Sequence, residues 1–312
     1  MHILVSGSLA YDKIMEYLGR FSDCIVPEKI HTLNLSFVTE NIKEHFGGTA
    51  GDIAYGLALL GEKPEILAAV GRDFQLYREW LEKSGVGLNH LRIILDKPTT
   101  VSNIMADCAN NQIATLCLGA MAHSCEIEKE KIPTDAIAII SPGNVDDMRR
   151  LPALYREKGV PFIFDPGQQI AALTANDLRN GITGAKIFIS NDYELALVLE
   201  KTGWSEKDIL SSAEMIITTL GEKGSRIQTQ EKVLDIPIVK IKEVVDPTGA
   251  GDAYRAGLIK GIIQNWPIET AGRFGGVMAA YAIEAHGPQE YRTTFSEACA
   301  RYREDFGTEP NS

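Results

Sequence analysis

Cysteine is scarce in this sequence of 312 residues, and its few cysteines form no recognisable pattern. None of them belongs to a C-x-x-C pair, and their odd number argues against a disulfide framework. Scattered free thiols are typical of reducing compartments, so we expect a cytoplasmic protein. The five cysteines are Cys24, Cys108, Cys117, Cys125 and Cys299.

An excess of basic charge and long apolar runs are also missing. The chain has 31 Lys and Arg residues against 42 Asp and Glu residues, a net charge of −11, and it contains no basic cluster. Such a chain is a poor candidate for tracking nucleic-acid phosphates. No apolar run approaches the roughly 18 residues of a membrane span. The start, MHILVSGSLAYD, lacks the basic and apolar regions of a signal peptide. We therefore expect neither nucleic acid nor a membrane as a partner.

Several catalytic patterns are absent too. The six histidines show no metal-ligand spacing, and the sequence contains no Ser-His-Asp or Cys-His nucleophile pattern. The first strand candidate leads into GSLAYD rather than G-x-G-x-x-G. A dinucleotide-dependent oxidoreductase is therefore disfavoured.

What the chain does contain is an alternation of short apolar runs with helical patterns. This alternation predicts a largely parallel α/β sheet, in which ligands bind beyond the carboxyl ends of the strands. Four candidate strands end in polar residues of the kind that bind ligands, namely Asp165, Asn191, Thr219 and Asp246. The strand candidates are 2–8, 114–120, 136–143, 161–167, 186–192, 215–221 and 244–249, and the helix candidates are 51–61, 73–85, 147–159 and 193–203.

Two stretches depart from this alternation. Residues 24–46 and 92–119 read as alternating strands with turn residues such as Asn110-Asn111. They predict either a small antiparallel lid or two hairpins at the edge of the main sheet. We expect one catalytic domain over 1–312, with a lid subdomain inserted from about 13–46 and 92–120.

The segment DPTGAGDAYRAG, residues 246–257, combines an anion site with a carboxylate. Gly249, Ala250 and Gly251 stand where a helix with 3.6-residue apolar spacing begins, and the free amides of a helix start attract anions. Asp252 follows at once. It would act as the N-cap of the helix or as a general base beside the anion hole.

This segment resembles the C-terminal signature of the ribokinase-like (PfkB) carbohydrate and nucleoside kinases. Other family motifs follow in order across nearly the whole chain: GSLAYD (7–12), FGGTAGD (46–52), NDYE (191–194) and TLGEKG (219–224). The resemblance implies a three-layer α/β/α fold with a mostly parallel central sheet and a small β lid. It also implies an ATP-dependent phosphotransferase whose acceptor is an alcohol group, with ATP and Mg²⁺ as cofactors.

Within that family the chain looks most like bacterial adenosine kinases. The matching stretches are LNLSF (33–37), 68–81, 111–121, DPGQQ (165–169), KTGWSE (201–206) and 281–290. This branch implies transfer of the γ-phosphoryl group to the 5′-hydroxyl of adenosine, which yields AMP. It further implies a homodimer formed through the lid and a monovalent cation such as K⁺ near Asp246 and Thr248.

The resemblance assigns an acceptor site to residues that also have plain structural alternatives. Asp12 would accept two ribose hydroxyls or cap a turn, and Gly47 and Gly48 would allow close backbone approach to the sugar or form an ordinary turn. Ser8 and Ser36 would contact the nucleoside or satisfy local backbone groups. The remaining acceptor residues implied are Asp52, Gln168 and Gln169.

The same resemblance assigns the phosphoryl-transfer residues. Asp252 would be the base, and the amides around Gly249, Ala250 and Gly251 would form the anion hole. Asn191 and Glu194 would hold Mg²⁺ through water, or they would simply cap the following helix. Thr219, Gly221, Gly224 and Gly251, together with Asn191, would line the nucleotide. Arg255 would contact phosphate or be a solvated surface charge.

The departures from the family pattern concentrate at the acceptor. Asp52 stands where the family usually has Asn, while Ser102 and Leu116 stand where Phe is expected around the base, and Ala172 replaces a basic residue. Another nucleoside or a small sugar therefore stays an alternative acceptor. A non-catalytic nucleoside sensor would be favoured by loss of Asp252 or of an anion-hole glycine, but all of them are present.

Overall fold

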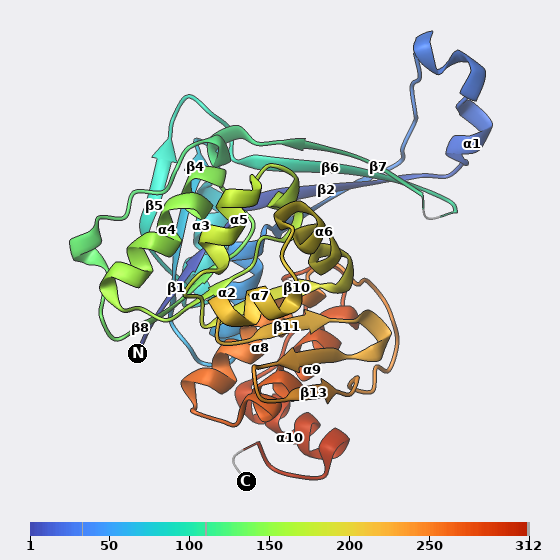
Figure 1. Cartoon of the computed structure of the whole chain (residues 1–312). Coiled ribbons are helices and arrows are strands. Elements are labelled where there is room, and N and C mark those ends of the chain that lie inside the picture. The colour runs from blue at the N-terminus through green and yellow to red at the C-terminus, as the bar shows by residue number, and fades with distance from the viewer. Residues whose placement is uncertain (33, 110, 311–312) are drawn as a thin grey trace.

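Two β-sheets organise the chain in the computed structural model, which describes residues 1–32, 34–109 and 111–310 (Figure 1). The larger sheet has nine strands in the order β13-β12-β11-β10-β9-β8-β1-β4-β5. Seven of these strands are parallel, whereas β12 and β13 extend one edge as antiparallel strands. The strands are β1 (His2–Ser6), β4 (Pro64–Gly71), β5 (Gly87–Ile94), β8 (Ala136–Ile140), β9 (Phe162–Phe164), β10 (Ile187–Asn191), β11 (Ile216–Thr219), β12 (Ser225–Gln228) and β13 (Val233–Ile236).

Helices cover both faces of the larger sheet because its central strands are apolar on both sides. In β8, Ile137 and Ile139 join a core with α2, α3, α8 and α9, whereas Ala138 and Ile140 face a second core with α4, α5, α6 and α7. The three-layer α/β/α arrangement predicted from the sequence is confirmed. These helices are α2 (Thr49–Leu59), α3 (Gln75–Lys83), α4 (Val145–Lys158), α5 (Ala175–Ile182), α6 (Asp192–Thr202), α7 (Glu206–Ser212), α8 (Ala250–Ile263) and α9 (Ile268–Ile283), and α10 (Phe295–Phe306) packs on α9.

The second sheet is small and separate, so the prediction of hairpins on the edge of the main sheet is wrong. Its order is β3-β2-β6-β7, built from β2 (Ala10–Tyr17), β3 (Ile42–Gly47), β6 (Thr100–Asp107) and β7 (Gln112–Cys117). Figure 1 shows this sheet reaching out from one end of the body, with the segment that contains α1 (Phe21–Cys24) beyond it. The division of the chain into a catalytic domain and a lid subdomain stays a prediction.

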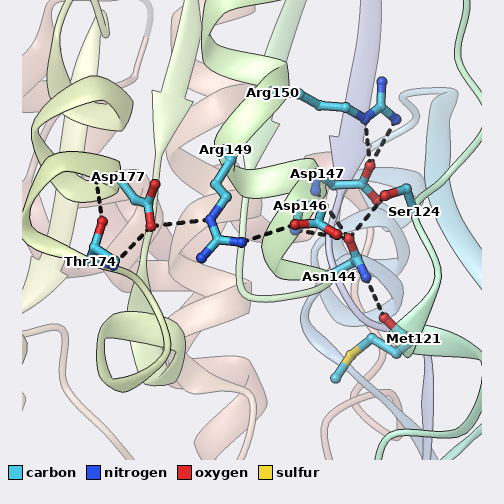
Figure 2. Close-up of polar contacts among 9 residues, drawn as sticks. All are labelled: Met121, Ser124, Asn144, Asp146, Asp147, Arg149, Arg150, Thr174 and Asp177. Atoms are coloured by element: carbon cyan, nitrogen blue, oxygen red, sulfur yellow. Dashed lines mark hydrogen bonds and ion pairs between the residues drawn. The ribbon is translucent and has the colours of Figure 1, made fainter.

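A polar network ties the chain that returns from the small sheet to the start of α4 (Figure 2). The Asn144 side-chain oxygen accepts the backbone amides of Asp146 and Asp147, which caps the helix. Its amide nitrogen donates to the carbonyl of Met121 at 2.8 Å, and Ser124 donates to the Asn144 oxygen at 3.2 Å. Asn144 therefore serves both as a helix cap and as an anchor for the segment that follows β7.

Three local expectations from the sequence are wrong or untested. Residues 244–249 form no strand, because Val244 is exposed and the amides of Val245 and Asp246 bind the carbonyl of Ile283 in α9. The expected strand over 24–41 is absent from the described residues 24–32 and 34–41, of which 27–32 are a 3₁₀ helix. Leu33 of the LNLSF motif and Asn110 of the expected turn lie outside the described residues. Over the ranges described, no helix is long and apolar enough to cross a membrane.

Candidate active site

The centre of the candidate site is the start of α8, where the chain makes a glycine-dependent turn. Gly249 is the N-cap residue, and its φ of 78° lies in the left-handed region that favours glycine. A Cβ at this position would lie 2.5 Å from the Cβ of Pro288, which excludes any larger residue. The Asp246 carboxylate accepts the Thr248 amide at 2.9 Å and thereby fixes the turn. The first amides of a 14-residue helix attract anions, so the predicted anion site would lie at this turn, which we call the anion turn.

Asp252 lies in the first turn of α8 and does not cap the helix. No side chain caps α8 within the described residues, so the N-cap alternative for Asp252 is not what the structure has. Burial raises the pKa of Asp252 to about 7, with Arg255 lowering it and Asp165 and Glu194 raising it. A carboxylate with a pKa in this range is suited to taking a proton at neutral pH.

Arg255 is buried, so the alternative of a solvated surface charge is wrong, whereas a phosphate contact stays a prediction. Its guanidinium binds Asp165 at 2.5 Å and donates to the carbonyl of Gly251 at 2.8 Å. The ion pair connects the carboxyl end of β9 with the anion turn of α8. The second carboxylate oxygen of Asp165 is buried and has no hydrogen-bond partner among the described residues.

Asn191 and Glu194 form a capping box at the start of α6, as the structural alternative predicted. The Asn191 side chain accepts the Glu194 amide at 2.7 Å, and the Glu194 carboxylate accepts the Asn191 amide at 2.8 Å. Glu194 lies near enough to Asp165 for that charge to raise its pKa, and burial raises it further. No group of three metal-binding side chains occurs in the ranges described. The oxygen donors of Asn191, Glu194 and Asp165 nevertheless suit Mg²⁺ that keeps most of its water ligands.

A cavity of about 330 Å³ adjoins the anion turn. Thr219, Gly221, Gly224 and Gly251, which the sequence assigned to the nucleotide, line it, whereas Asn191, which was assigned with them, does not. Its remaining wall is mostly apolar and includes Ile238, Val239, Val244, Ala280 and Ile283. The cavity therefore combines a mostly apolar wall with the anion turn, which suits a nucleotide.

On the other side of the turn, Asp12 faces the substrate loop. It lies on β2 opposite His45 of β3, and burial raises its pKa to about 6 while His45 lowers it. A Cβ added at Gly47 would lie 2.3 Å from a carboxylate oxygen of Asp12. Gly48 has a φ of 93°, and a Cβ there would meet the carbonyl oxygen of Ser8 at 2.6 Å. The two glycines thus allow the loop to approach Asp12 closely.

Asp52 is buried in the first turn of α2 and belongs to a directed hydrogen-bond network. Trp80 donates to the Gln289 side-chain oxygen at 2.9 Å, so the amide nitrogen of Gln289 faces Asp52 at 2.8 Å and the Tyr77 hydroxyl at 2.5 Å. Tyr77 in turn donates to the carbonyl of Gly47 at 2.9 Å. Burial raises the pKa of Asp52 well above its usual range, and Asp252 and Asp12 raise it further.

Ser102 and Leu116 lie in the same cross-strand row as Asp12. The register pairs Asp12 with His45 and Ser102, and Ser102 with Leu116, so the four side chains share one face of the small sheet. Neighbouring strands lie roughly 4.8 Å apart, which sets the spacing along this row. We call His45, Asp12, Ser102 and Leu116 the acceptor row.

Four predicted acceptor residues have structural roles or no visible link to this row. The Ser8 hydroxyl accepts the Thr49 amide at 3.1 Å at the start of α2, and Gln169 donates to the carbonyl of Gly143 at 2.7 Å. Gln168 is exposed, and Ser36 is exposed in an extended segment. No contact among the described residues joins Ser36 to Asp12 or Asp52. Nucleoside contacts by these residues stay predictions.

Sequence reasoning missed His45, Gln289 and the Tyr77–Trp80 pair as members of this site. Gln289 lies 237 residues from Asp52 along the chain, so no local spacing indicates their contact. Its only signal was membership of the motif-like stretch 281–290. The strand alternation around His45 would have placed it beside Asp12 if the pairing of β2 with β3 had been known.

Comparisons with known proteins agree with this geometry. A model of the pfkB family carbohydrate kinases matches residues 10–294. A nucleoside kinase of Methanothermobacter thermautotrophicus is 30% identical over 319 residues, spanning 99% of this chain and 97% of that protein. A nucleoside kinase of Methanocaldococcus jannaschii is 29% identical over 276 residues, spanning 88% of this chain and 91% of that protein.

Solved structures of nucleoside kinases are also similar to this chain. The Burkholderia thailandensis nucleoside kinase in complex with inosine has a TM-score of 0.88 at 38% identity, over 98% of this chain and 99% of that one. Its ADP-inosine complex has a TM-score of 0.86 at 39% identity, over 99% of this chain and 97% of that one. Matches of this extent establish the family and its ribokinase-like fold. The chain belongs to the pfkB family of carbohydrate kinases and is a phosphotransferase that acts on a hydroxyl acceptor.

Proposed function

We propose that this protein is an ATP-dependent nucleoside kinase that phosphorylates the 5′-hydroxyl of a purine nucleoside, with adenosine as the first acceptor to test. The observation that carries the proposal is the position of Asp252. It directly follows Ala250 and Gly251, which line the nucleotide-sized cavity, and its charge acts on Asp52, as does the charge of Asp12 in the acceptor row.

In the proposed reaction Asp252 accepts the proton of the acceptor hydroxyl as its oxygen bonds to the γ-phosphorus. The bond from that phosphorus to the β-γ bridging oxygen of ATP breaks, and ADP leaves. Amides of 249–252 hold the equatorial phosphoryl oxygens, so in-line positioning and electrostatic stabilisation supply most of the rate. Bound Mg²⁺ would neutralise phosphate charge, with Asn191, Glu194 and Asp165 as the residues suited to hold its water shell.

Two observations favour a nucleoside over a free sugar as the acceptor. The relatives with the most extensive matches are nucleoside kinases, and one was solved with inosine. The acceptor row also continues from Asp12 across two further strands, which gives room for a base beside a ribose held at Asp12. Ser102 offers a hydroxyl and Leu116 an apolar surface there, in place of aromatic stacking.

The test is an ATP-dependent phosphorylation screen over adenosine, inosine, guanosine, cytidine, ribose and other pentoses. We expect adenosine or inosine to give the highest kcat/KM. Turnover of ribose with no turnover of any nucleoside would replace the proposal by a sugar kinase. The absence of turnover with every acceptor would favour the sensor alternative. A monovalent-cation requirement is tested in the same assay by exchanging K⁺ for tetramethylammonium.

Asp252→Asn is the matched variant for the reaction itself. It preserves the size of the side chain but cannot accept the proton, so we expect turnover to fall at least about 100-fold. ATP binding, measured by calorimetry, should stay close to that of the wild type. Near wild-type turnover in this variant would remove Asp252 from the role of base.

A further inference from the structure

Three carboxyl groups converge on the acceptor side of the site without a matching number of cations. Asp12, Asp52 and Asp252 lie near enough that the charges of Asp12 and Asp252 both raise the pKa of Asp52. Arg255, whose charge lowers the pKa of Asp252, is paired with Asp165, and His45, whose charge lowers the pKa of Asp12, lies opposite Asp12 on β3. If all three carboxyls ionised, the acceptor side would hold three negative charges next to an incoming triphosphate.

Asp52 is the member of the three with the poorest environment for charge. Its side chain is 6% exposed, and the only side-chain donor that reaches it within the described residues is the neutral amide of Gln289. No lysine or arginine pairs with it over those ranges. The tyrosines packed nearby, Tyr77 and Tyr291, have pKa values raised by burial and by Asp52, so their hydroxyls stay neutral. Neither side chain can supply the positive charge that an ionised Asp52 would need. An unpaired buried carboxylate is costly, and such groups take up a proton instead.

The orientation of the Gln289 side-chain amide is also compatible with a proton on Asp52. Trp80 can only donate, so the Gln289 oxygen must face Trp80 and its amide nitrogen must face Asp52. One oxygen of Asp52 therefore acts as an acceptor toward Gln289. The other oxygen is free to carry a hydrogen and to donate it.

We propose that Asp52 is a neutral carboxylic acid in the working enzyme and donates a hydrogen bond to the acceptor nucleoside beside Asp252. The proposal rests on the proposed nucleoside kinase function for the identity of the ligand, but not for the protonation state. It gives two neighbouring carboxyls different roles: Asp252 accepts a proton in the reaction, and the buried Asp52 keeps its proton and positions the acceptor.

The direct test is infrared spectroscopy of the ligand-free protein at about pH 8.5, well above the pKa values of Asp12 and Asp252. The band of a protonated carboxylic acid should persist in the spectrum of the wild type. The contribution of Asp52 to this band should be missing from the spectrum of Asp52→Asn. This readout needs no substrate, so it holds whether or not the proposed function does. The absence of any acid band in the wild type at this pH would overturn the proposal, and that result does not depend on the variant folding.

The functional test is the pH dependence of inosine and adenosine binding, measured by calorimetry without ATP. Above the pKa of Asp52, wild-type affinity should fall by about tenfold per pH unit. The amide of Asp52→Asn donates at every pH, so the ratio of its affinity to that of the wild type should rise by the same factor. Gln289→Leu removes the donor that favours the ionised form, and the alkaline loss should then begin at higher pH. Parallel pH profiles for the wild type and Asp52→Asn, measured up to pH values at which the acid band of Asp52 has disappeared from the infrared spectrum, would contradict the donor role.

Discussion

At the residue scale, the site depends on carboxyl groups whose proton affinities differ although their chemistry is the same. Asp12 and Asp252 have pKa values raised to about 6 and about 7, and both must be ionised to accept hydrogen from hydroxyl groups. Burial is the largest cause in each case, so the fold sets the proton affinities rather than any single neighbour.

The pH dependence of the reaction follows from these values. We expect kcat/KM to fall as the pH drops through about 7, because protonated Asp252 cannot accept the hydroxyl proton, with a slope of about tenfold per pH unit. The slope should steepen below about pH 6, where Asp12 is also protonated. Steady-state kinetics at saturating ATP provide the measurement, and a flat profile between pH 5 and pH 8 would contradict both assignments.

The raised pKa of Asp252 also affects stability, and the sign is opposite to that of a salt-bridged carboxylate. The folded state binds this proton more tightly than the unfolded state, so stability falls as the pH rises from about 4 to about 7. Asp252→Asn should therefore raise the melting temperature at pH 8 and leave it nearly unchanged at pH 4. Thermal denaturation of the ligand-free protein measures this, and a lower melting temperature for the variant at pH 8 would contradict the expectation.

Gly47 is the acceptor-side glycine whose substitution would act directly on Asp12. In Gly47→Ala the new methyl group would collide with the Asp12 carboxylate, which must then leave the acceptor row. A displacement of about 1 Å can lower kcat/KM by about 100-fold, and we expect a loss of that size. Gly203→Asn is the control, because Gly203 ends α6 in a left-handed conformation with open space around it. Equal kinetic losses in the two variants would point to general destabilisation.

At the element scale, β1, β8, β9, β10 and β11 of the larger sheet and four of its helices could be predicted, because their apolar runs and helical periods are strong. β4 and α5 were not predicted, and the edge strands and the helices beyond residue 203 carry weaker patterns. Residues 244–249 show why such a reading fails. The run Val244-Val245 has the propensity of a strand, but its amides bind the end of α9 rather than a neighbouring strand.

Substitutions at Asn144 test how the start of α4 is joined to the segment that follows β7. Asn144→Ala removes the cap of α4 and the bond to Met121, and together these should cost about 1–2 kcal/mol in the free energy of unfolding. Asn144→Asp keeps the capping oxygen and loses only the donor to Met121, so it should recover most of the capping contribution. Urea denaturation of both variants measures the difference. Equal losses would mean that the anchor, and not the cap, carries the effect.

At the scale of the whole molecule, the small sheet carries an apolar row on the face opposite the acceptor row, beside a polar row that contains the Lys13–Glu44 ion pair. The register aligns Ile42, Met15, Met105 and Ile113 on that face, and Ile42 and Ile113 are exposed by 62% and 39%. Both edge strands, β3 and β7, are also open to pairing. The homodimer expected from the sequence would cover this surface.

We therefore predict a dimer in sedimentation experiments, and a monomer when Ile42 and Ile113 are both replaced by Asp. Val233→Asp is the control, because Val233 is 57% exposed on β13 at the far edge of the larger sheet. A wild-type monomer at micromolar concentration would contradict the prediction.

The sequence predicted the nucleotide side of the candidate site better than the acceptor side, and the reason is physical. The anion turn and the nucleotide glycines are local, so motif spacing located residues that the cavity brings together. The acceptor side is assembled from β2, β3, α2, α3 and the segment around Gln289, and long-range contacts such as Gln289–Asp52 leave no periodic signal. Sequence therefore indicated the reaction more fully than the surroundings of the acceptor.

The separation of the two sheets has a consequence for how this enzyme can evolve. The transfer chemistry lies at the start of α8 on the larger sheet, whereas Ser102 and Leu116 occupy strands of the smaller one. Mutations in the acceptor row can therefore change which compound is chosen without disturbing the catalytic turn. Under the proposed function, acceptor preference and phosphoryl transfer depend on different strands and helices. We therefore expect that laboratory selection for new acceptors can be confined to a few positions on β6 and β7.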